Sequence, residues 1–186
     1  MRTLRHTLFA LGLALLCAGI AVAEPAHPPL YKVTKGQSTV YLMGSMHFLM
    51  ASDYPLPADV DNAYREADKV YFELPPDELQ SPATLLATMQ LGTYHDAHTL
   101  QDDVSPELWK RILDYASKNG LPAAAVPKFE PWFLAVAIVG LESQKMGLTG
   151  DSGLDMHFAK QAATDKKPVA GFETVVQQLS IFHDAP

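Results

Sequence analysis

The chain has 186 residues, of which 48% are hydrophobic and 19% are charged, and its formal net charge is −7. This composition is typical of a globular protein and excludes the disordered, collagen-like and disulfide-rich classes. The excess of acidic residues disfavours a nucleic-acid-binding surface, because phosphate recognition requires Lys and Arg gathered on one face. The length allows one domain or two small ones.

The first 23 residues are predicted to be a secretory signal. Arg2 and Arg5 precede a nearly uncharged apolar run that ends in Ala21-Val22-Ala23, the small-x-small pattern of a cleavage site. The run is short for a spanning helix, which needs about 20 apolar residues. We therefore expect cleavage before Glu24 and a periplasmic or secreted protein without a stable membrane span, with an uncleaved anchor as the alternative.

The single cysteine bears on lipid attachment and on disulfides. Cys17 follows Leu16, whereas a lipoprotein site has a small residue at that position, so attachment through Cys17 is the less favoured alternative. If the signal is cleaved after Ala23, the mature chain has neither a thiol nor a disulfide. Its net charge becomes −9, because loss of Arg2 and Arg5 leaves 12 basic and 21 acidic residues.

The mature chain is expected to begin with a tether and a hairpin. Residues 24–29 read Glu-Pro-Ala-His-Pro-Pro, a sequence that cannot form a regular element. Residues 30–34 and 38–43 are rich in β-forming side chains, and Lys35-Gly36-Gln37 between them has turn chemistry.

The next elements predict the fold class. From Asp59 apolar residues recur at helical spacing, and residues 69–74 form a strand that Pro75-Pro76 ends. The order strand, helix, strand indicates an α/β fold with a central sheet and flanking helices. We assign residues 30–186 to this single domain.

The second half of the chain is expected to be mostly helical. The further predicted elements are helices over residues 105–118, 130–146, 153–163 and 174–183 and a strand over residues 168–172. The segment 132–141 is apolar enough to predict a buried helix. No strand follows the last helix, so the domain is expected to be incomplete at its C-terminus.

Three polar side chains follow predicted strands. His47 comes after the strand that ends at Met43, and Glu73 and Glu173 lie at the ends of two others. Ligands of open α/β sheets bind outside the carboxyl ends of the strands, and Gly44 would allow a sharp turn close to a ligand. One imidazole and two carboxylates could divide acid and base roles or bind a divalent metal, for which Mn, Fe, Co or Zn suits these donors better than Ca.

Each candidate also has a purely structural interpretation. His47 could be a hydrogen-bonded loop or core histidine, Glu73 a solvent-facing residue of an alternating strand, and Glu173 an acid favoured by a helix N-terminus. His95 and His98 stand three residues apart, but the turn composition around them favours solvated loop histidines. The sequence has no serine-hydrolase elbow, phosphate-binding glycine loop or His-Glu-x-x-His motif.

Several sequence blocks, in this order, resemble the TraB/GumN family and its secreted bacterial branch in particular. They are VYLMGSMH at 40–47, ADKVYFEL at 67–74, Pro131-Trp132, GLDMHF at 153–158, KPVAGFET at 167–174 and Gln178-Leu179. The resemblance implies an α/β fold related to the TIKI metalloproteases and to the erythromycin esterase and ChaN-like proteins. It also implies a divalent metal cofactor, with Mn or Co favoured and Zn as an alternative.

The resemblance assigns the functional positions of the family to this chain. They are Gly44 and His47 of a Gly-x-x-His motif, the strand-end acids Glu73 and Glu173, Gly153 and Asp155 of a Gly-x-Asp block, and Gln178. Family members continue to a second Gly-x-x-His motif, which this sequence does not reach. The chain is therefore expected to be either a fragment or the product of a truncated gene. A metal site that needs both histidines is expected to be incomplete in it.

The expected function is a metal-dependent, peptidase-like hydrolase of the bacterial cell envelope. His47, Glu73 and Glu173 are the expected metal ligands and catalytic groups, supported by a second set, Gly44, Asp155 and Gln178. The substrate is expected to be a peptide or an envelope component, with no nucleic acid as partner. The alternatives are a non-catalytic periplasmic binding or accessory protein, for example one linked to polysaccharide production, and an inactive truncated product.

Overall fold

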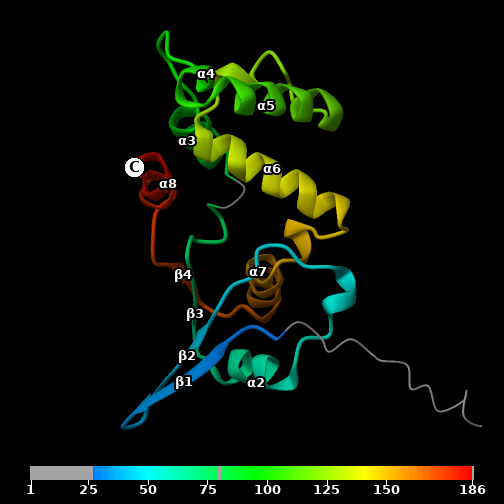
Figure 1. The fold of residues 1–186 in the computed structure, drawn as a ribbon. Helices are drawn as coiled ribbons and strands as arrows, with labels where there is room; N and C mark the ends of the chain where they lie inside the picture. The colour runs from blue at the N-terminus through cyan, green and yellow to red at the C-terminus, as the bar shows by residue number, and fades with distance from the viewer. Residues whose placement is uncertain (1–26, 79–80, 186) are drawn as a thin grey trace, which may run out of the picture.

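The computed structural model describes residues 27–78 and 81–185 (Figure 1). The predicted signal, Cys17 and the first part of the predicted tether lie outside the described residues. The strands are β1 (Leu30–Lys35), β2 (Ser38–Met43), β3 (Val70–Phe72) and β4 (Val169–Gly171). The α-helices are α2 (Ala58–Glu66), α3 (Pro82–Leu91), α4 (Leu100–Asp103), α5 (Pro106–Asn119), α6 (Pro131–Lys145), α7 (Leu154–Asp165) and α8 (Val175–His183).

The α/β class predicted from the sequence is confirmed, and the described strands form two small sheets. β1 and β2 are an antiparallel hairpin in which Lys35 pairs with Ser38 across the tight turn, where Gly36 has a φ of +61°. β3 and β4 are parallel, and Val70 pairs with Val169. A parallel pair requires a long crossover connection, and here α3 to α7 provide it.

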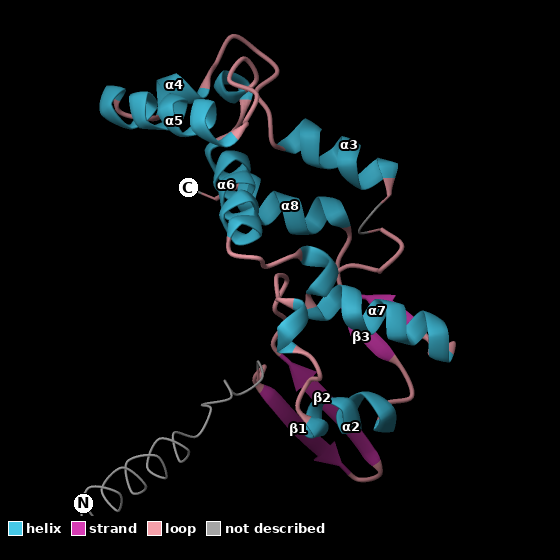
Figure 2. Cartoon of the chain, turned by 90° about the vertical axis from the view of Figure 1, so that its right-hand side faces the viewer, coloured by secondary structure: helices cyan, strands magenta, loops and turns pink. Residues whose placement is uncertain are grey.

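The described chain packs around two separate hydrophobic cores. The first joins Val60 of α2, Phe72 of β3, and Leu154 and Phe158 of α7. The second lies among α4, α5 and α6 and includes Val126. Figures 1 and 2 show the strands with α2 and α7 in one half of the molecule and α3 to α6 with α8 in the other.

The ends of α5 follow the predicted signals closely. The Ser105 hydroxyl accepts a hydrogen bond from the backbone N–H of Leu108, and Pro106 opens the helix. Gly120 ends it in the left-handed conformation with a φ of +74°, which costs glycine little because it has no Cβ.

The predicted burial of α6 is wrong. Leu134 and Ser143 are its buried residues, whereas Val136 and Val139 are 52% and 56% exposed. The helix is apolar around most of its circumference, but only one face reaches the second core. Sequence hydrophobicity therefore identified the helix but not how much of it is covered.

Among the described residues, no helix combines the length and the apolar character needed to cross a bilayer.

Candidate functional site

The strand-end positions predicted for Glu73 and Glu173 come together because β3 and β4 run parallel. Glu73 directly follows β3, and Glu173 lies two residues beyond β4. The backbone N–H of Glu173 donates to the backbone carbonyl of Glu73 at 2.9 Å, so the pairing continues beyond the strands. Both acids therefore lie at the same edge of this sheet.

His47 reaches the start of α7 through close backbone contacts. The N–H of Leu154, the first residue of α7, donates to the carbonyl of Met46 at 2.9 Å. A Cβ on Gly153 would lie 2.2 Å from the carbonyl oxygen of His47, so only glycine fits there. In the Gly-x-Asp block, Gly153 therefore lies against the His47 backbone. Asp155, two residues later, lies beside the His47 side chain.

An imidazole, a carboxylate and a hydroxyl form a hydrogen-bonded cluster at this point. His47 Nδ1 lies 2.7 Å from Asp155 Oδ2, and the Ser45 hydroxyl donates to the same oxygen at 2.5 Å. The Asp155 side chain is 20% exposed, whereas that of His47 is 61% exposed. Solvent or a ligand can therefore reach the imidazole, while Asp155 is largely enclosed.

The cluster shifts the pKa values of both ionisable partners. The hydrogen bond to Asp155 raises the pKa of His47 against the opposing effect of burial, and the negative charges of Asp155 and Glu73 add to it. Burial acts to raise the pKa of Asp155, but the hydrogen bonds from His47 and Ser45 hold it below its usual value. Both shifts favour the charged forms of the two groups, so the interaction widens the pH range in which an imidazolium–carboxylate pair exists.

Glu73 has a partner in the other half of the molecule. The side-chain amide of Gln178, on α8, donates to Glu73 Oε2 at 2.9 Å. Glu173 makes no side-chain hydrogen bond or ion pair within the described residues, and it precedes Thr174, the N-cap of α8. This position, directly before the N-cap of α8, matches the helix-terminus interpretation of Glu173.

Gly44 has a structural reason to be glycine. Its backbone N–H donates to the carbonyl of Pro29 at 2.9 Å, and a Cβ at this position would lie 2.7 Å from Pro29 Cγ. The close approach that Gly44 allows in the described chain is therefore to the end of the predicted tether. Pro28, the residue before Pro29, is fully buried, so this end of the predicted tether is held against the folded chain.

The remaining histidine pair occupies an exposed loop, as the turn composition predicts. His95 Nε2 lies 2.8 Å from the carbonyl oxygen of Gln90, and His98 Nε2 lies 2.8 Å from a carboxylate oxygen of Asp103. These partners account for both rings.

The described side chains do not by themselves form a complete metal site. Within residues 27–78 and 81–185, no group of three or more His, Cys, Asp and Glu side chains is arranged to hold an ion. The imidazole and carboxylate donors suit Mn, Co or Zn, but a catalytic zinc ion typically has three protein ligands. The trio His47, Glu73 and Glu173 therefore stays a prediction, and the arrangement described here offers proton transfer through His47 and Asp155.

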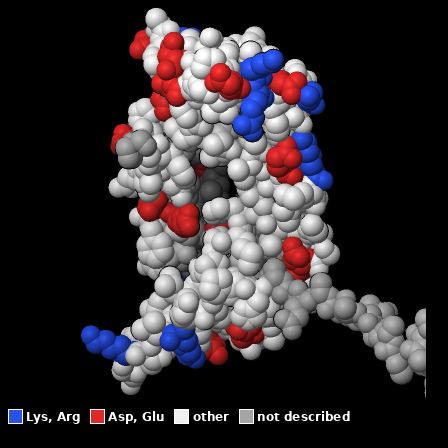
Figure 3. All heavy atoms as spheres, in the orientation of Figure 1, with Lys and Arg blue, Asp and Glu red and all other residues white. Residues whose placement is uncertain are grey.

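One face of the molecule is hollowed. Figure 3 shows the hollow near the centre of the molecule, with Asp and Glu side chains along one side of it.

Sequence reasoning missed Ser45 as a member of the cluster. The signal was present in Gly44-Ser45-Met46-His47, because residues two apart in an extended segment point to the same side. The pattern does not indicate that Ser45 and His47 share a hydrogen-bonding partner, Asp155, which lies more than 100 residues later in the sequence.

These features define the class: an α/β protein with polar side chains at the carboxyl ends of its strands and an imidazole–carboxylate pair beside a helix start. The chain belongs to the TraB/PrgY/gumN family, whose family model matches residues 29–186. The resemblance identified from the sequence blocks is therefore confirmed.

Similar proteins include "Uncharacterized protein YbaP" from Escherichia coli (strain K12) and from Shigella flexneri. Each is 21% identical over 151 residues, which cover 81% of this chain and 54% of the relative. "Metalloprotease TIKI1" from Danio rerio is 26% identical over 166 residues, covering 75% of this chain and 33% of that protein. The chain thus spans about half the length of the YbaP proteins and a third of TIKI1. No solved structure matches it.

Proposed function

We propose that the protein is a metal-dependent hydrolase of peptidase type that acts in the bacterial cell envelope. The observation that carries the proposal is the His47–Asp155 pair, which lies beyond the carboxyl end of β2 and presents an accessible imidazole. Family membership and the similarity to a protein named as a metalloprotease support the hydrolytic reaction class.

His47 has the central chemical role in this proposal. Because Nδ1 faces Asp155, Nε2 is the nitrogen available to accept a proton from an attacking water or to bind a metal. Asp155 orients the ring and stabilises the imidazolium that forms on proton uptake. The same proton can then be given to the leaving group, so a single imidazole completes the transfer.

Glu73 and Glu173 are the proposed acidic partners of His47. Gln178 binds one carboxylate oxygen of Glu73 and leaves the other for a proton or a ligand. A divalent ion such as Mn, Co or Zn, when bound, would polarise the scissile carbonyl group and acidify water. The described donors make up only part of the shell that such an ion requires.

Metal analysis of the exported protein tests the proposal. Wild-type protein and the variants His47→Ala and His95→Ala are exposed to Mn, Co and Zn, and bound metal is measured after dialysis. We expect uptake by the wild type and by His95→Ala, since His95 lies on an exposed loop, and loss in His47→Ala. Peptide hydrolysis should follow the same order.

Equal and negligible metal uptake in all three proteins would instead support the non-catalytic alternative, a periplasmic binding or accessory protein. A cooperative unfolding transition in the wild type excludes the third reading, an inactive truncated product that does not fold. The proposed location is tested separately by the mass of the exported chain, which should begin at Glu24.

A further inference from the structure

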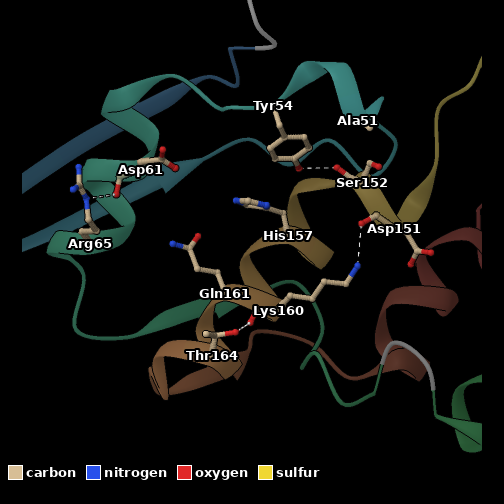
Figure 4. Close-up of a pocket in the computed structure, with 10 residues that line it drawn as sticks. All are labelled: Ala51, Tyr54, Asp61, Arg65, Asp151, Ser152, His157, Lys160, Gln161 and Thr164. Atoms are coloured by element: carbon tan, nitrogen blue, oxygen red, sulfur yellow. Dashed lines mark hydrogen bonds between the residues drawn. The ribbon is translucent and has the colours of Figure 1, made fainter.

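A pocket of about 760 Å³, with mostly polar residues among its lining, opens beside α7, apart from the candidate site. Asp155 and His157 are two residues apart on this helix and therefore point to nearly opposite sides of it. Asp155 belongs to the His47 cluster, whereas His157 lines the pocket. The pocket is lined by Ala51, Tyr54, Asp61, Arg65, Asp151, Ser152, His157, Lys160, Gln161 and Thr164 (Figure 4).

One wall of the pocket is held in a fixed position. The rings of Tyr54 and His157 pack with their centroids 4.7 Å apart. The Tyr54 hydroxyl donates to the carbonyl of Ser152 at 2.7 Å, which fixes the ring. Tyr54 and His157 come from segments about 100 residues apart in sequence, so the wall exists only in the folded chain.

The cationic side chains of the pocket are already engaged with neutral oxygens. Lys160 Nζ donates to the backbone carbonyl of Asp151 at 3.3 Å. Arg65 donates to the backbone carbonyl of Asp61 and to the side chain of Asn62. Neither cation forms an ion pair within the described residues, and both lie at the edges of the pocket in Figure 4.

Three polar groups in the pocket have unused hydrogen-bonding capacity. The Asp61 carboxylate, the His157 ring and the Gln161 amide make no side-chain hydrogen bond to any described residue, and Figure 4 shows them directed into the same space. Burial lowers the pKa of His157, so its ring is neutral and has one donor and one acceptor. The carboxylate accepts hydrogen bonds, and the amide and the neutral ring each both donate and accept, so the three groups offer a ligand donors and acceptors close together.

The formal charge of the lining sums to zero. Arg65 and Lys160 balance Asp61 and Asp151, so the lining attracts neither anions nor cations on balance. An uncharged ligand also avoids the cost of removing a charge from water. Hydroxyl groups both donate and accept, which matches a carboxylate, an amide and a neutral imidazole at once.

We propose that this pocket binds a small uncharged molecule rich in hydroxyl groups, of the size of a sugar ring. Its volume lies within the range of about 300–1,000 Å³ that is usual for small-molecule sites. Hydroxyls of the ligand donate to Asp61 and accept from Gln161, while the Tyr54–His157 wall covers its apolar side. The proposal does not depend on the hydrolase function, because no group of the His47 cluster lines the pocket.

An NMR titration of the ¹⁵N-labelled exported protein tests it. The probes are methyl glucoside, which is uncharged, and glucosamine and glucuronate, which have a similar ring with a positive or a negative charge. We expect a saturable shift of the Gln161 side-chain amide and the His157 ring with methyl glucoside, and weaker binding of both charged probes.

Two matched variants complete the test. Gln161→Ala removes a group that the ligand contacts and should weaken methyl glucoside binding about tenfold or more. Gln144→Ala, on the exposed side of α6, should leave the affinity unchanged. The proposal is overturned by the absence of saturable binding in the folded wild type, by tighter binding of either charged probe, or by an equal loss in both variants.

Discussion

At the scale of single residues, the His47 site depends on one carboxylate oxygen that accepts two hydrogen bonds. Asp155 Oδ2 is the acceptor for both His47 and Ser45, and Asp155 is the largely enclosed member of the cluster. A buried carboxylate is retained in its charged form only when such donors replace water. The strand pattern predicted where His47 lies, but it did not identify Ser45, and the enclosure of Asp155 results from packing.

The His47–Asp155 pair should make stability depend on pH. The pKa of His47 is raised above its ordinary value of 6.5, so its contribution is complete below that pH and is lost as the pH rises through the folded value. The pKa of Asp155 is lowered below 3.8, so its contribution is complete above that pH and is lost as the pH falls through the folded value. Asp155→Asn should therefore be most destabilising between these limits.

Urea unfolding at several pH values measures this effect. The difference between wild type and Asp155→Asn should shrink at alkaline pH, where His47 is neutral in both proteins. Asp68→Asn changes an exposed turn carboxylate and serves as the control. A difference between wild type and Asp155→Asn that stays constant from acid to alkaline pH would contradict the charged pair.

Gly153 provides a second test at this scale. Gly153→Ala would place a Cβ 2.2 Å from the His47 carbonyl oxygen, so the backbone must shift. We expect a loss of about 1–3 kcal/mol in the free energy of unfolding, as for other overpacked sites. Gly150→Ala is the matched control, because its Cβ would meet its nearest atoms at 3.9 Å and 4.0 Å. Equal losses in the two variants would show that the close approach is absent.

At the scale of elements, local signals determine where helices and strands begin and end, and packing determines how much of each is covered. The hairpin shows the difference. Lys32 and Tyr41 contact Glu66 of α2, whereas Tyr31 and Val40 on the other face are 64% and 61% exposed. Alternation along the strands predicts two distinct faces but does not indicate which face is covered.

Two glycines at helical positions should respond in opposite directions to the same substitution. Gly120→Ala forces a Cβ into the left-handed conformation that ends α5 and should destabilise the protein by about 1 kcal/mol. Gly140→Ala lies inside α6 with no atom within 4 Å of the new Cβ, and should stabilise it by about 0.5–1 kcal/mol. Thermal unfolding of both variants measures the two shifts, and shifts of the same sign would contradict the assigned conformations.

At the scale of the whole molecule, the two cores share no residue, and the candidate site lies where the halves meet. Glu73 follows β3 in one half, and Gln178 reaches it from α8 in the other. A ligand that contacts both Glu73 and Gln178 would bridge the two halves. Local unfolding of either half would therefore disrupt this contact.

The two cores should open separately. Leu154→Ala removes a fully buried side chain of the first core, and Val126→Ala does so in the second. Each truncation should cost several kcal/mol locally, about 2–5 for the leucine, and should speed amide hydrogen exchange mainly in its own half. Faster exchange throughout the chain in either variant would show instead that the halves unfold as one unit.

The sequence by itself determined the α/β class, the hairpin, the ends of α5 and the family, because turn residues, helix caps and ordered motifs act over a few neighbouring positions. The tertiary structure alone decided which side chains meet: Asp155 with His47 and Ser45, Gln178 with Glu73, and Tyr54 with His157. It also decided that one face of α6 is exposed. These contacts join segments some 100 to 110 residues apart, and a local pattern contains no information about which distant residue fills the space beside it.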